Sequence, residues 1–244
     1  MGRRVPEEII KNNLEYINTR KQKLNEYEKD IQANFLRGFG MDAKSIAGQY
    51  LLLNNTDEAR KWFTESARYY LESKKINDNL EGRSFEYSSG LSMIVSASLS
   101  GDRNLKNEVA ESILKRKPYT NPPGLFLKFQ VIVSNLILGN VNIDEELQEL
   151  KTLENKYSKK TGGFYTGYTD ALMALRTKDS ENLKKSVEDI LSRFSKSRMS
   201  RDYPYEFEIA MILMLAKDRG MDIDPERDID KKYHKYIPMG LLKT

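Results

Sequence analysis

The chain has 244 residues, of which 39% are hydrophobic and 31% are charged, and its formal net charge at pH 7 is +4. These values exclude a disordered chain, and the near balance of charges argues against a dedicated nucleic-acid-binding protein, whose basic residues usually dominate one face. The absence of cysteine excludes disulfides, thiolate catalysis and cysteine-ligated metals.

The sequence predicts neither a signal peptide nor a membrane-spanning segment. The basic pair Arg3-Arg4 is followed by Val5-Pro6-Glu7-Glu8 rather than by an apolar stretch. The longest apolar run, 125–138, is interrupted by polar side chains and is too short to cross a bilayer. We therefore expect a cytoplasmic protein that does not bind a membrane.

The first predicted helix runs from about Pro6 to Phe35 and fills an amino-terminal region of residues 1–37. Proline suits the first turn of a helix, and apolar residues then recur at helical spacing. Gly38-Phe39-Gly40 is expected to end this helix, because glycine is a poor helix former. The helix would then cover the rest of the chain as a cap.

Four short polar turns divide residues 42–219 into helix hairpins. Each turn follows a leucine, and the leucines lie 46, 39 and 37 residues apart: Leu53, Leu99, Leu138 and Leu175. A period near 40 residues is typical of stacked helix pairs, each of which buries its apolar face against its neighbours. We therefore predict an all-α, TPR-like α-solenoid that forms a single domain over residues 1–244, with at least nine helices and no strand.

Three details of these helices are also predicted. One helix is expected to begin at the capping residue Thr56 and to bury Trp62 on its core face, with Phe63 and Tyr70 nearby. The last long helix is expected to run from Tyr203 to Arg219. A tail over residues 220–244 should then be irregular until an apolar ending that packs onto the array.

No catalytic or metal-binding constellation emerges from the sequence. His234 lies in a charged stretch without a nucleophile or an orienting acid. The acidic residues between Asp222 and Asp230 lack the glycine and the glutamate that a calcium loop requires. Gly162 and Gly167 have phosphate-loop spacing, but the lysine after them and the strand before them are missing. We expect no enzyme activity, no metal and no cofactor.

Two tyrosine-rich clusters form the candidate partner-binding surface. One spans residues 162–168, where two tyrosines lie beside glycines, and the other spans residues 201–205. Tyrosine and arginine are enriched where proteins anchor their partners, whereas the alternative is that these rings pack between the repeats. The candidate anchors are Tyr165, Tyr168, Arg201, Tyr203 and Tyr205.

The segment from Glu208 to Met221 resembles the final helix of immunity family forty-nine, an all-α family from polymorphic toxin systems. In that family an alanine-rich helix ends in an arginine-glycine step, here Arg219-Gly220. A linker then leads to a tyrosine-proline-leucine-leucine ending, here Tyr236-Ile237-Pro238-Met239-Gly240-Leu241-Leu242. The stretch Ala59-Arg60-Lys61-Trp62-Phe63 is similar to an early helix of the family. The resemblance implies a protein that binds and neutralises a cognate toxin.

Protein binding is therefore the preferred function, with steric inhibition of a toxin as the leading hypothesis. One alternative is a helical-repeat scaffold or regulatory adaptor that binds a peptide in its groove. A third is a helical repeat that binds RNA or DNA. Several of the basic runs fall at helix ends, where positive charge complements the helix dipole, so nucleic acid is the less favoured partner. These runs are Arg20-Lys21, Lys74-Lys75, Lys115-Arg116-Lys117, Lys159-Lys160 and Lys184-Lys185.

Overall fold

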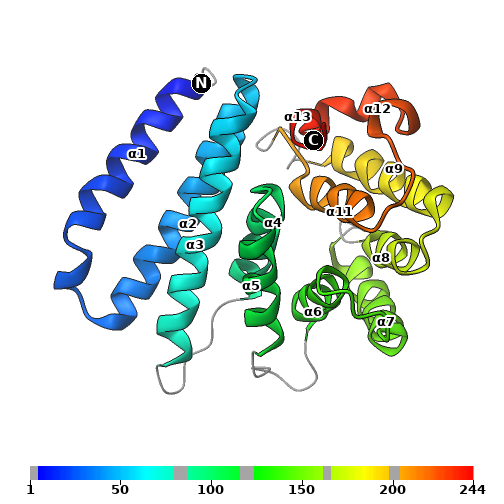
Figure 1. The fold of residues 1–244 in the computed structure, drawn as a ribbon, viewed down its shortest axis with the longest axis horizontal. Coiled ribbons are helices and arrows are strands. Elements are labelled where there is room, and N and C mark those ends of the chain that lie inside the picture. The colour runs from blue at the N-terminus through cyan, green and yellow to red at the C-terminus, as the bar shows by residue number, and fades with distance from the viewer. Residues whose placement is uncertain (1–4, 80–86, 116–123, 162–165, 198–203, 244) are drawn as a thin grey trace. The chain divides into compact units, whose positions relative to one another are not determined.

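The computed structural model describes residues 5–79, 87–115, 124–161, 166–197 and 204–243. Within these ranges every regular element is a helix and no strand occurs, which confirms the all-α prediction (Figure 1). None of the helices in the described ranges is long and apolar enough to cross a membrane. The elements are α1 Pro6–Gln22, η1 Leu24–Glu26, α2 Lys29–Leu52, α3 Thr56–Asp78, α4 Tyr87–Leu99, α5 Arg103–Leu114, α6 Leu125–Ile137, α7 Asp144–Thr161, α8 Tyr168–Thr177, α9 Ser180–Lys196, α11 Phe207–Asp218, α12 Pro225–Asp228, η2 Lys231–Tyr236 and α13 Met239–Leu242.

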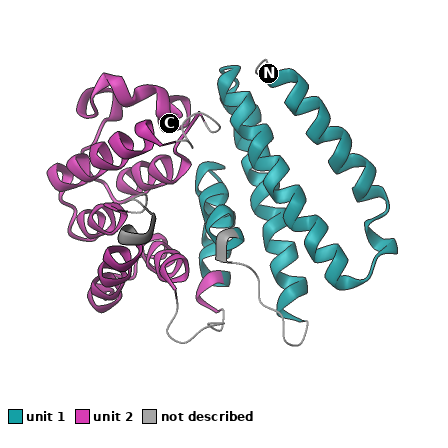
Figure 2. Ribbon diagram, turned by 180° about the vertical axis from the view of Figure 1, so that it is seen from behind, with its two compact units in different colours: residues 1–112 teal, residues 113–244 magenta. Residues whose placement is uncertain are grey.

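The sequence predicts one domain over residues 1–244, and by its internal contacts the chain separates into two compact units, Met1–Ser112 and Ile113–Thr244 (Figure 2). In the first unit α2 packs against α1 and α3, and α3 packs in turn against α4. In the second unit α8 packs against α6, α7, α9 and α11. Helices that follow one another in the sequence are thus neighbours in space, as hairpins require, whereas the TPR-like solenoid stays a prediction.

All four predicted turns contain a residue with left-handed backbone geometry. The φ angles are 56° at Asn54, 78° at Gly101, 80° at Gly139 and 57° at Lys178. At three of these turns the next residue donates its N–H to a carbonyl five positions earlier, namely Asn55 to Tyr50, Asn140 to Asn135 and Asp179 to Ala174. This is the hydrogen bond of a Schellman motif, which ends one helix and frees the chain to begin the next.

Side-chain caps then start the helices that follow the turns. Asp102 Oδ1 accepts a 3.0 Å hydrogen bond from the N–H of Leu105, at the start of α5. The cap of α3 is Asn55, one residue before the predicted Thr56, because Asn55 Oδ1 accepts a 3.2 Å hydrogen bond from Glu58 N–H. The turn chemistry read from the sequence therefore places these starts to within one residue.

The amino-terminal helix is shorter than predicted, and the chain breaks at a different place. α1 ends at Gln22, a 3-10 turn spans Leu24–Glu26, and α2 begins at Lys29. The break occurs at Glu28, whose backbone is extended at ψ 154°, and neither glycine nor proline marks it in the sequence. α2 instead continues through the Gly38-Phe39-Gly40 stretch that was expected to end a helix.

Gly40 stays helical because α2 and α3 approach each other closely. A Cβ atom at this position would lie 2.8 Å from Cδ2 and from Cε2 of Tyr70. Ser66 Oγ donates a 2.8 Å hydrogen bond to the carbonyl oxygen of Gly40. The packing that glycine permits here outweighs its low helix propensity, which costs about 1 kcal/mol relative to alanine.

Trp62 is half-buried, which corrects the prediction that it is largely buried. The core positions of α3 are Phe63 and Tyr70, which are 0% and 1% exposed. Trp62 lies at the edge of this stripe and packs against the cluster of Ile10, Ile17, Leu36, Phe39, Ala43, Ile46 and Tyr69. Part of the indole therefore reaches solvent.

The carboxy-terminal tail is packed, as predicted, but it is helical rather than irregular. It forms α12, η2 and α13, and its side chains Ile229, Ile237 and Leu241 are buried. The ring of Tyr236 packs edge-on against Phe194 of α9, with ring centroids 5.5 Å apart. These apolar contacts hold the tail on the second unit.

Candidate functional site

The structure describes two of the five predicted anchor residues. Tyr165, Arg201 and Tyr203 lie outside the described residues. The other two differ in burial, because Tyr168 is 9% exposed whereas Tyr205 is half-buried. The two residues therefore have separate roles.

Tyr168 is a core residue of the second unit. Its ring packs against Phe129 of α6, with ring centroids 5.8 Å apart and planes at 87°. Its hydroxyl donates a 2.8 Å hydrogen bond to Oε1 of the buried Glu206. This corrects the prediction of a partner contact at Tyr168, because both ends of the side chain are used inside the unit.

Tyr205 keeps part of its ring exposed and remains a candidate anchor. It precedes α11, and its ring centroid lies 6.0 Å from that of Phe207. Burial raises the pKa of its hydroxyl above the usual 10.0, so the side chain is neutral at physiological pH. A half-buried, uncharged tyrosine offers an apolar face and a polar tip, a combination that is common at interface anchors.

The hydrogen bond between Tyr168 and Glu206 joins the two tyrosine-rich clusters. One cluster leads into α8 and the other into α11, and these helices pack against each other. Residues 38 positions apart in the sequence thus meet in the second unit. We name the described ends of the clusters the tyrosine junction, which consists of Thr166, Gly167, Tyr168, Pro204, Tyr205 and Glu206.

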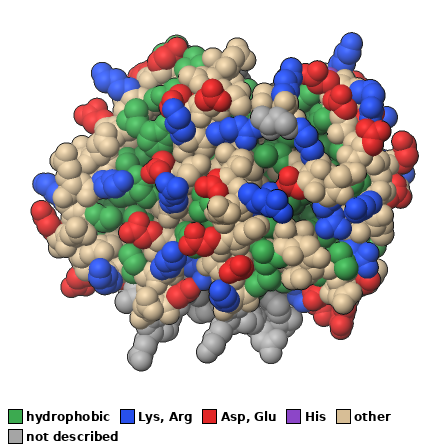
Figure 3. All heavy atoms as spheres, in the orientation of Figure 1, with side chains coloured by type: hydrophobic (Ala, Val, Ile, Leu, Met, Phe, Trp, Pro, Cys, Tyr) green, Lys and Arg blue, Asp and Glu red, His purple; other side chains and the backbone are tan. Residues whose placement is uncertain are grey.

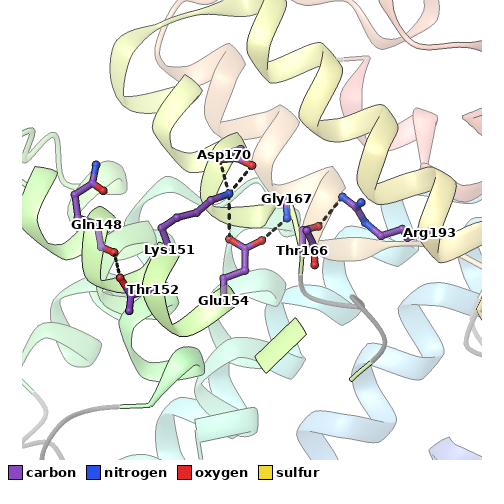
Figure 4. A network of polar contacts seen from close by, with 8 residues as sticks. All are labelled: Gln148, Lys151, Thr152, Glu154, Thr166, Gly167, Asp170 and Arg193. Carbon is purple, nitrogen blue, oxygen red and sulfur yellow. Dashed lines mark hydrogen bonds and ion pairs between the residues drawn. The ribbon is translucent and has the colours of Figure 1, made fainter. Parts of the chain in front are cut away.

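Two charged side chains hold one peptide group of the tyrosine junction from opposite ends (Figure 4). Oε1 of Glu154, on α7, accepts a hydrogen bond from Gly167 N–H. Nη2 of Arg193, on α9, donates a 2.9 Å hydrogen bond to the carbonyl oxygen of Thr166. That carbonyl and that N–H belong to the same peptide bond, so its position and its orientation are fixed. We name Glu154 and Arg193 the peptide clamp.

Gly167 is needed for the clamp to close. Its φ of +98° lies in the left-handed region, which costs other residues about 1–2 kcal/mol. A Cβ atom would also lie 2.9 Å from Arg193 Nη2 and 3.2 Å from Ile190 Cγ1. Glycine therefore allows both charged side chains to reach the peptide group.

Lys151 connects the clamp to α8. Its Nζ lies 2.7 Å from both carboxylate oxygens of Asp170 and 3.9 Å from Oε2 of Glu154. The side chain of Glu154 is 1% exposed, whereas Lys151 and Asp170 reach solvent. The buried negative charge is thus balanced by a cation at the surface, as a buried charge requires.

The clamp carries two buried atoms without a hydrogen bond among the described residues, Glu154 Oε2 and Arg193 Nε. Leaving a buried polar atom unsatisfied costs about 1–3 kcal/mol. Natural proteins accept such costs mainly at functional or strained sites. At the peptide clamp a fixed backbone conformation is therefore kept at the expense of stability.

Sequence reasoning missed Glu154 and Arg193, although Glu154 carries a signal. Ile143, Leu147 and Leu150 are buried along α7, and Glu154 is the next position of that stripe. A carboxylate on the core face of an amphipathic helix needs a buried partner. The segment around Arg193 carries no comparable signal, because its hydrogen bond is to a backbone carbonyl 27 residues away.

The other sequence motifs have structural roles. Nε2 of His234 lies 2.8 Å from the carbonyl oxygen of Ile229, so the half-buried histidine helps to shape η2. In the acidic run, Arg227 Nη2 lies 3.1 Å from Asp222 Oδ1 and 2.7 Å from Asp228 Oδ2. Across the described residues no group of three or more His, Cys, Asp or Glu side chains is placed to hold a metal ion.

Charges of both signs alternate on the surface. On the face shown in Figure 3, Lys and Arg side chains are interspersed with Asp and Glu rather than gathered into one patch. Several cations are paired with carboxylates, such as Lys128 with Glu149 and Lys75 with Glu108. A stripe of unpaired basic residues, which phosphate binding would favour, does not appear on that face.

Comparisons with protein-family models, with curated proteins and with solved structures find no match to this chain. Its function is therefore inferred from the residues described above. Among them, the tyrosine junction combines a candidate anchor, a fixed backbone and unsatisfied buried atoms.

Proposed function

We propose that this chain binds another protein and that it is an immunity protein, which neutralises a cognate toxin by covering the toxin's active site. The observation that carries the proposal is the meeting of the two tyrosine-rich clusters at the tyrosine junction, through the Tyr168–Glu206 hydrogen bond. A few residues supply most of the binding energy at a protein interface, tyrosine and arginine are enriched among them, and they cluster.

The peptide clamp supports a binding role for the junction. Binding costs less conformational entropy when the contacting segment is already ordered in the free protein. Glu154 and Arg193 order the peptide group that begins α8. Tyr205 then supplies the half-buried ring from the other cluster, and Tyr165, Arg201 and Tyr203 remain predicted anchors of the same surface.

The carboxy-terminal motifs that resemble immunity family forty-nine hold the second unit together. Arg219 Nε donates a 3.1 Å hydrogen bond to the carbonyl oxygen of Leu175, near the end of α8. Gly220 adopts a φ of 71°, which ends α11 and lets the chain turn into the tail. The tail ending buries Ile237 and Leu241. Such motifs would preserve the scaffold in related proteins, while the partner-binding residues vary with the toxin.

Steric inhibition fits the chemistry of this chain. The tyrosine junction and the peptide clamp together contain carboxylates, a guanidinium and a peptide group that bind one another, and these groups fix a conformation rather than activate a substrate. An inhibitor of this kind needs a rigid surface with a few anchors and no reactive group. The proposal therefore uses the junction as a docking surface.

Affinity capture followed by a growth assay tests the proposal. The tagged full-length chain is expressed in its source cells, and the proteins that co-purify with it are identified by mass spectrometry. The main co-purifying protein is then produced in a sensitive host, alone and together with this chain. We expect growth arrest by that protein alone and normal growth when both are present.

Two other outcomes would contradict the toxin proposal. A co-purifying protein that does not affect growth would favour the scaffold or adaptor. Release of the bound material by nuclease, without a stoichiometric protein, would favour a nucleic-acid-binding repeat. The same assay thus separates the three functions that the sequence left open.

A further inference from the structure

The first unit contains a groove of about 470 Å³ between α3 and the start of α5. Ligand-binding pockets typically measure about 300–1,000 Å³. Its floor consists of Leu71 and Leu105, which are 4% and 5% exposed. The floor is apolar, so it suits the methylene groups of a long side chain.

The two cations in the groove walls already have carboxylate partners. Lys75 Nζ lies 3.1 Å from Glu108 Oε1, and this pair crosses the groove from α3 to α5. Arg68 Nη1 lies 3.6 Å from Glu65 Oε1, one turn earlier on α3. The positive charge of the walls is therefore neutralised within the unit.

Two carboxylates of the groove, Glu72 and Asp102, form no ion pair with another described residue. Glu72 is exposed on α3, and no hydrogen bond or ion pair joins it to another described residue. The pKa of Lys21 is raised chiefly by a hydrogen bond with Tyr69, and the charge of Glu72 makes only a small contribution to this rise. Asp102 uses Oδ1 to cap α5. The groove therefore presents an apolar floor and two carboxylates that have no ion-pair partner among the described residues.

We propose that this groove binds an arginine side chain of the protein partner. The aliphatic part of the arginine lies on Leu71 and Leu105, and the guanidinium donates hydrogen bonds to Glu72 and Asp102. Arginine fits better than lysine, because its planar guanidinium can bind two carboxylates at once and arginine is enriched among interface anchors. The inference rests on the proposed function for the identity of the partner, and it adds a second contact on the first unit.

A peptide titration tests the groove without the partner. The probe is a blocked tripeptide with a central arginine, and its control has citrulline, which keeps the shape and removes the charge. The full-length protein carries labelled leucine methyl groups, and the signals of Leu71 and Leu105 are followed by NMR. Binding is compared for the native protein, for Glu72→Gln and for the matched variant Glu58→Gln, which makes the same charge change on α3 outside the groove.

We expect saturable shifts of both leucines with the arginine tripeptide and about fivefold weaker binding of the citrulline tripeptide. Glu72→Gln should weaken arginine binding about threefold, while Glu58→Gln should leave it unchanged. Equal binding of both tripeptides, equal effects of both variants, or the absence of saturable shifts would overturn the inference.

The captured partner separates this inference from the proposed function. If a toxin is captured and Glu72→Gln binds it with unchanged affinity, the groove inference fails and the function stands. If no toxin is captured but the tripeptides behave as expected, the proposed function fails and the arginine preference of the groove stands.

Discussion

The two units each place a glycine at a close contact between helices, but the groups around the two glycines differ. In the first unit, Gly40 lies against the ring of Tyr70, and Ser66 Oγ hydrogen-bonds to the Gly40 carbonyl and to Ser96 Oγ at 2.8 and 3.0 Å. All of these groups are neutral. In the second unit, Gly167 lies between the acidic side chain of Glu154 and the basic side chain of Arg193, and one atom of each has no hydrogen bond among the described residues.

The difference teaches what each contact contributes. Neutral groups with satisfied hydrogen bonds pack two helices at little electrostatic cost, so the Gly40 contact stabilises the first unit. Burying acidic and basic side chains costs desolvation free energy. Such groups therefore contribute a fixed conformation more than stability. We therefore expect truncation of Tyr70 at the first contact to lower the unfolding free energy more than substitutions at the peptide clamp do.

The largest effect is expected for Tyr70→Ala, which removes the ring that faces Gly40. The side chain is 1% exposed, and truncating a buried aromatic residue costs about 3–5 kcal/mol of unfolding free energy. Denaturant unfolding followed by the fluorescence of Trp62, which lies in the same unit, measures the loss. Tyr70→Phe is the control, because it keeps the ring and loses only the hydroxyl; equal losses for both variants would contradict the packing account.

The second prediction concerns alkaline pH. Burial raises the pKa of Tyr70 to about 12, although hydrogen bonding to Ser92 and the charge of Arg37 lower it, and Asp42 adds to the rise. The Tyr70 hydroxyl releases its proton near pH 10 in the unfolded chain and near pH 12 in the folded chain. The contribution of protonated Tyr70 to the unfolding free energy is therefore complete below pH 10 and is lost between pH 10 and pH 12. The native protein should lose up to about 3 kcal/mol more than Tyr70→Phe over this range. The prediction is contradicted if the unfolding free energies of the two proteins fall in parallel over this pH range.

Gly40→Ala should lower the unfolding free energy by about 1–3 kcal/mol, because the added methyl group clashes with the Tyr70 ring. Gly38→Ala is a matched control on the same helix, since a Cβ there meets nothing within 4 Å. That control should instead stabilise the protein by about 0.5–1 kcal/mol. Thermal unfolding by circular dichroism compares the two, and a stabilising Gly40→Ala would show that α2 and α3 are not in close contact.

At the peptide clamp, Glu154→Leu should cost about 1–3 kcal/mol, because Gly167 N–H is left buried without an acceptor. Glu154→Gln keeps an acceptor oxygen and should cost less. The two variants are compared by denaturant unfolding followed by circular dichroism. Equal losses for Glu154→Gln and Glu154→Leu would mean that the negative charge, rather than the hydrogen bond, holds the junction.

The sequence predicts the turns well because their signals are local. Leucines followed by Asn, Gly and Asp mark both the left-handed residues and the caps, and these positions appear in the structure at Asn54, Gly101 and Gly139. The break near Glu28 has no such signal, and it was missed. Turns that are set by local residue types can therefore be predicted from the sequence, whereas the break near Glu28, which no local residue type marks, cannot.

Long-range contacts account for the remaining errors. Gly40 reads as a helix end, because the ring of Tyr70 that makes glycine necessary lies 30 residues further along the chain. Tyr168 reads as an anchor, because its partner Glu206 is 38 residues away. The candidate site was therefore predicted as two separate clusters, and their meeting at the tyrosine junction follows from the fold.

The most direct test of the proposed docking surface is the affinity of the captured partner for Tyr205→Ala, measured together with the melting temperature of the variant. Tyr233→Ala is the matched control, because Tyr233 is also half-buried in the second unit but lies in η2. Removing a true anchor costs about 2 kcal/mol or more, which weakens binding about 30-fold. We predict this loss for Tyr205→Ala at an unchanged melting temperature, and unchanged binding for Tyr233→Ala. Full-strength binding by Tyr205→Ala would contradict the placement of the docking surface at the tyrosine junction.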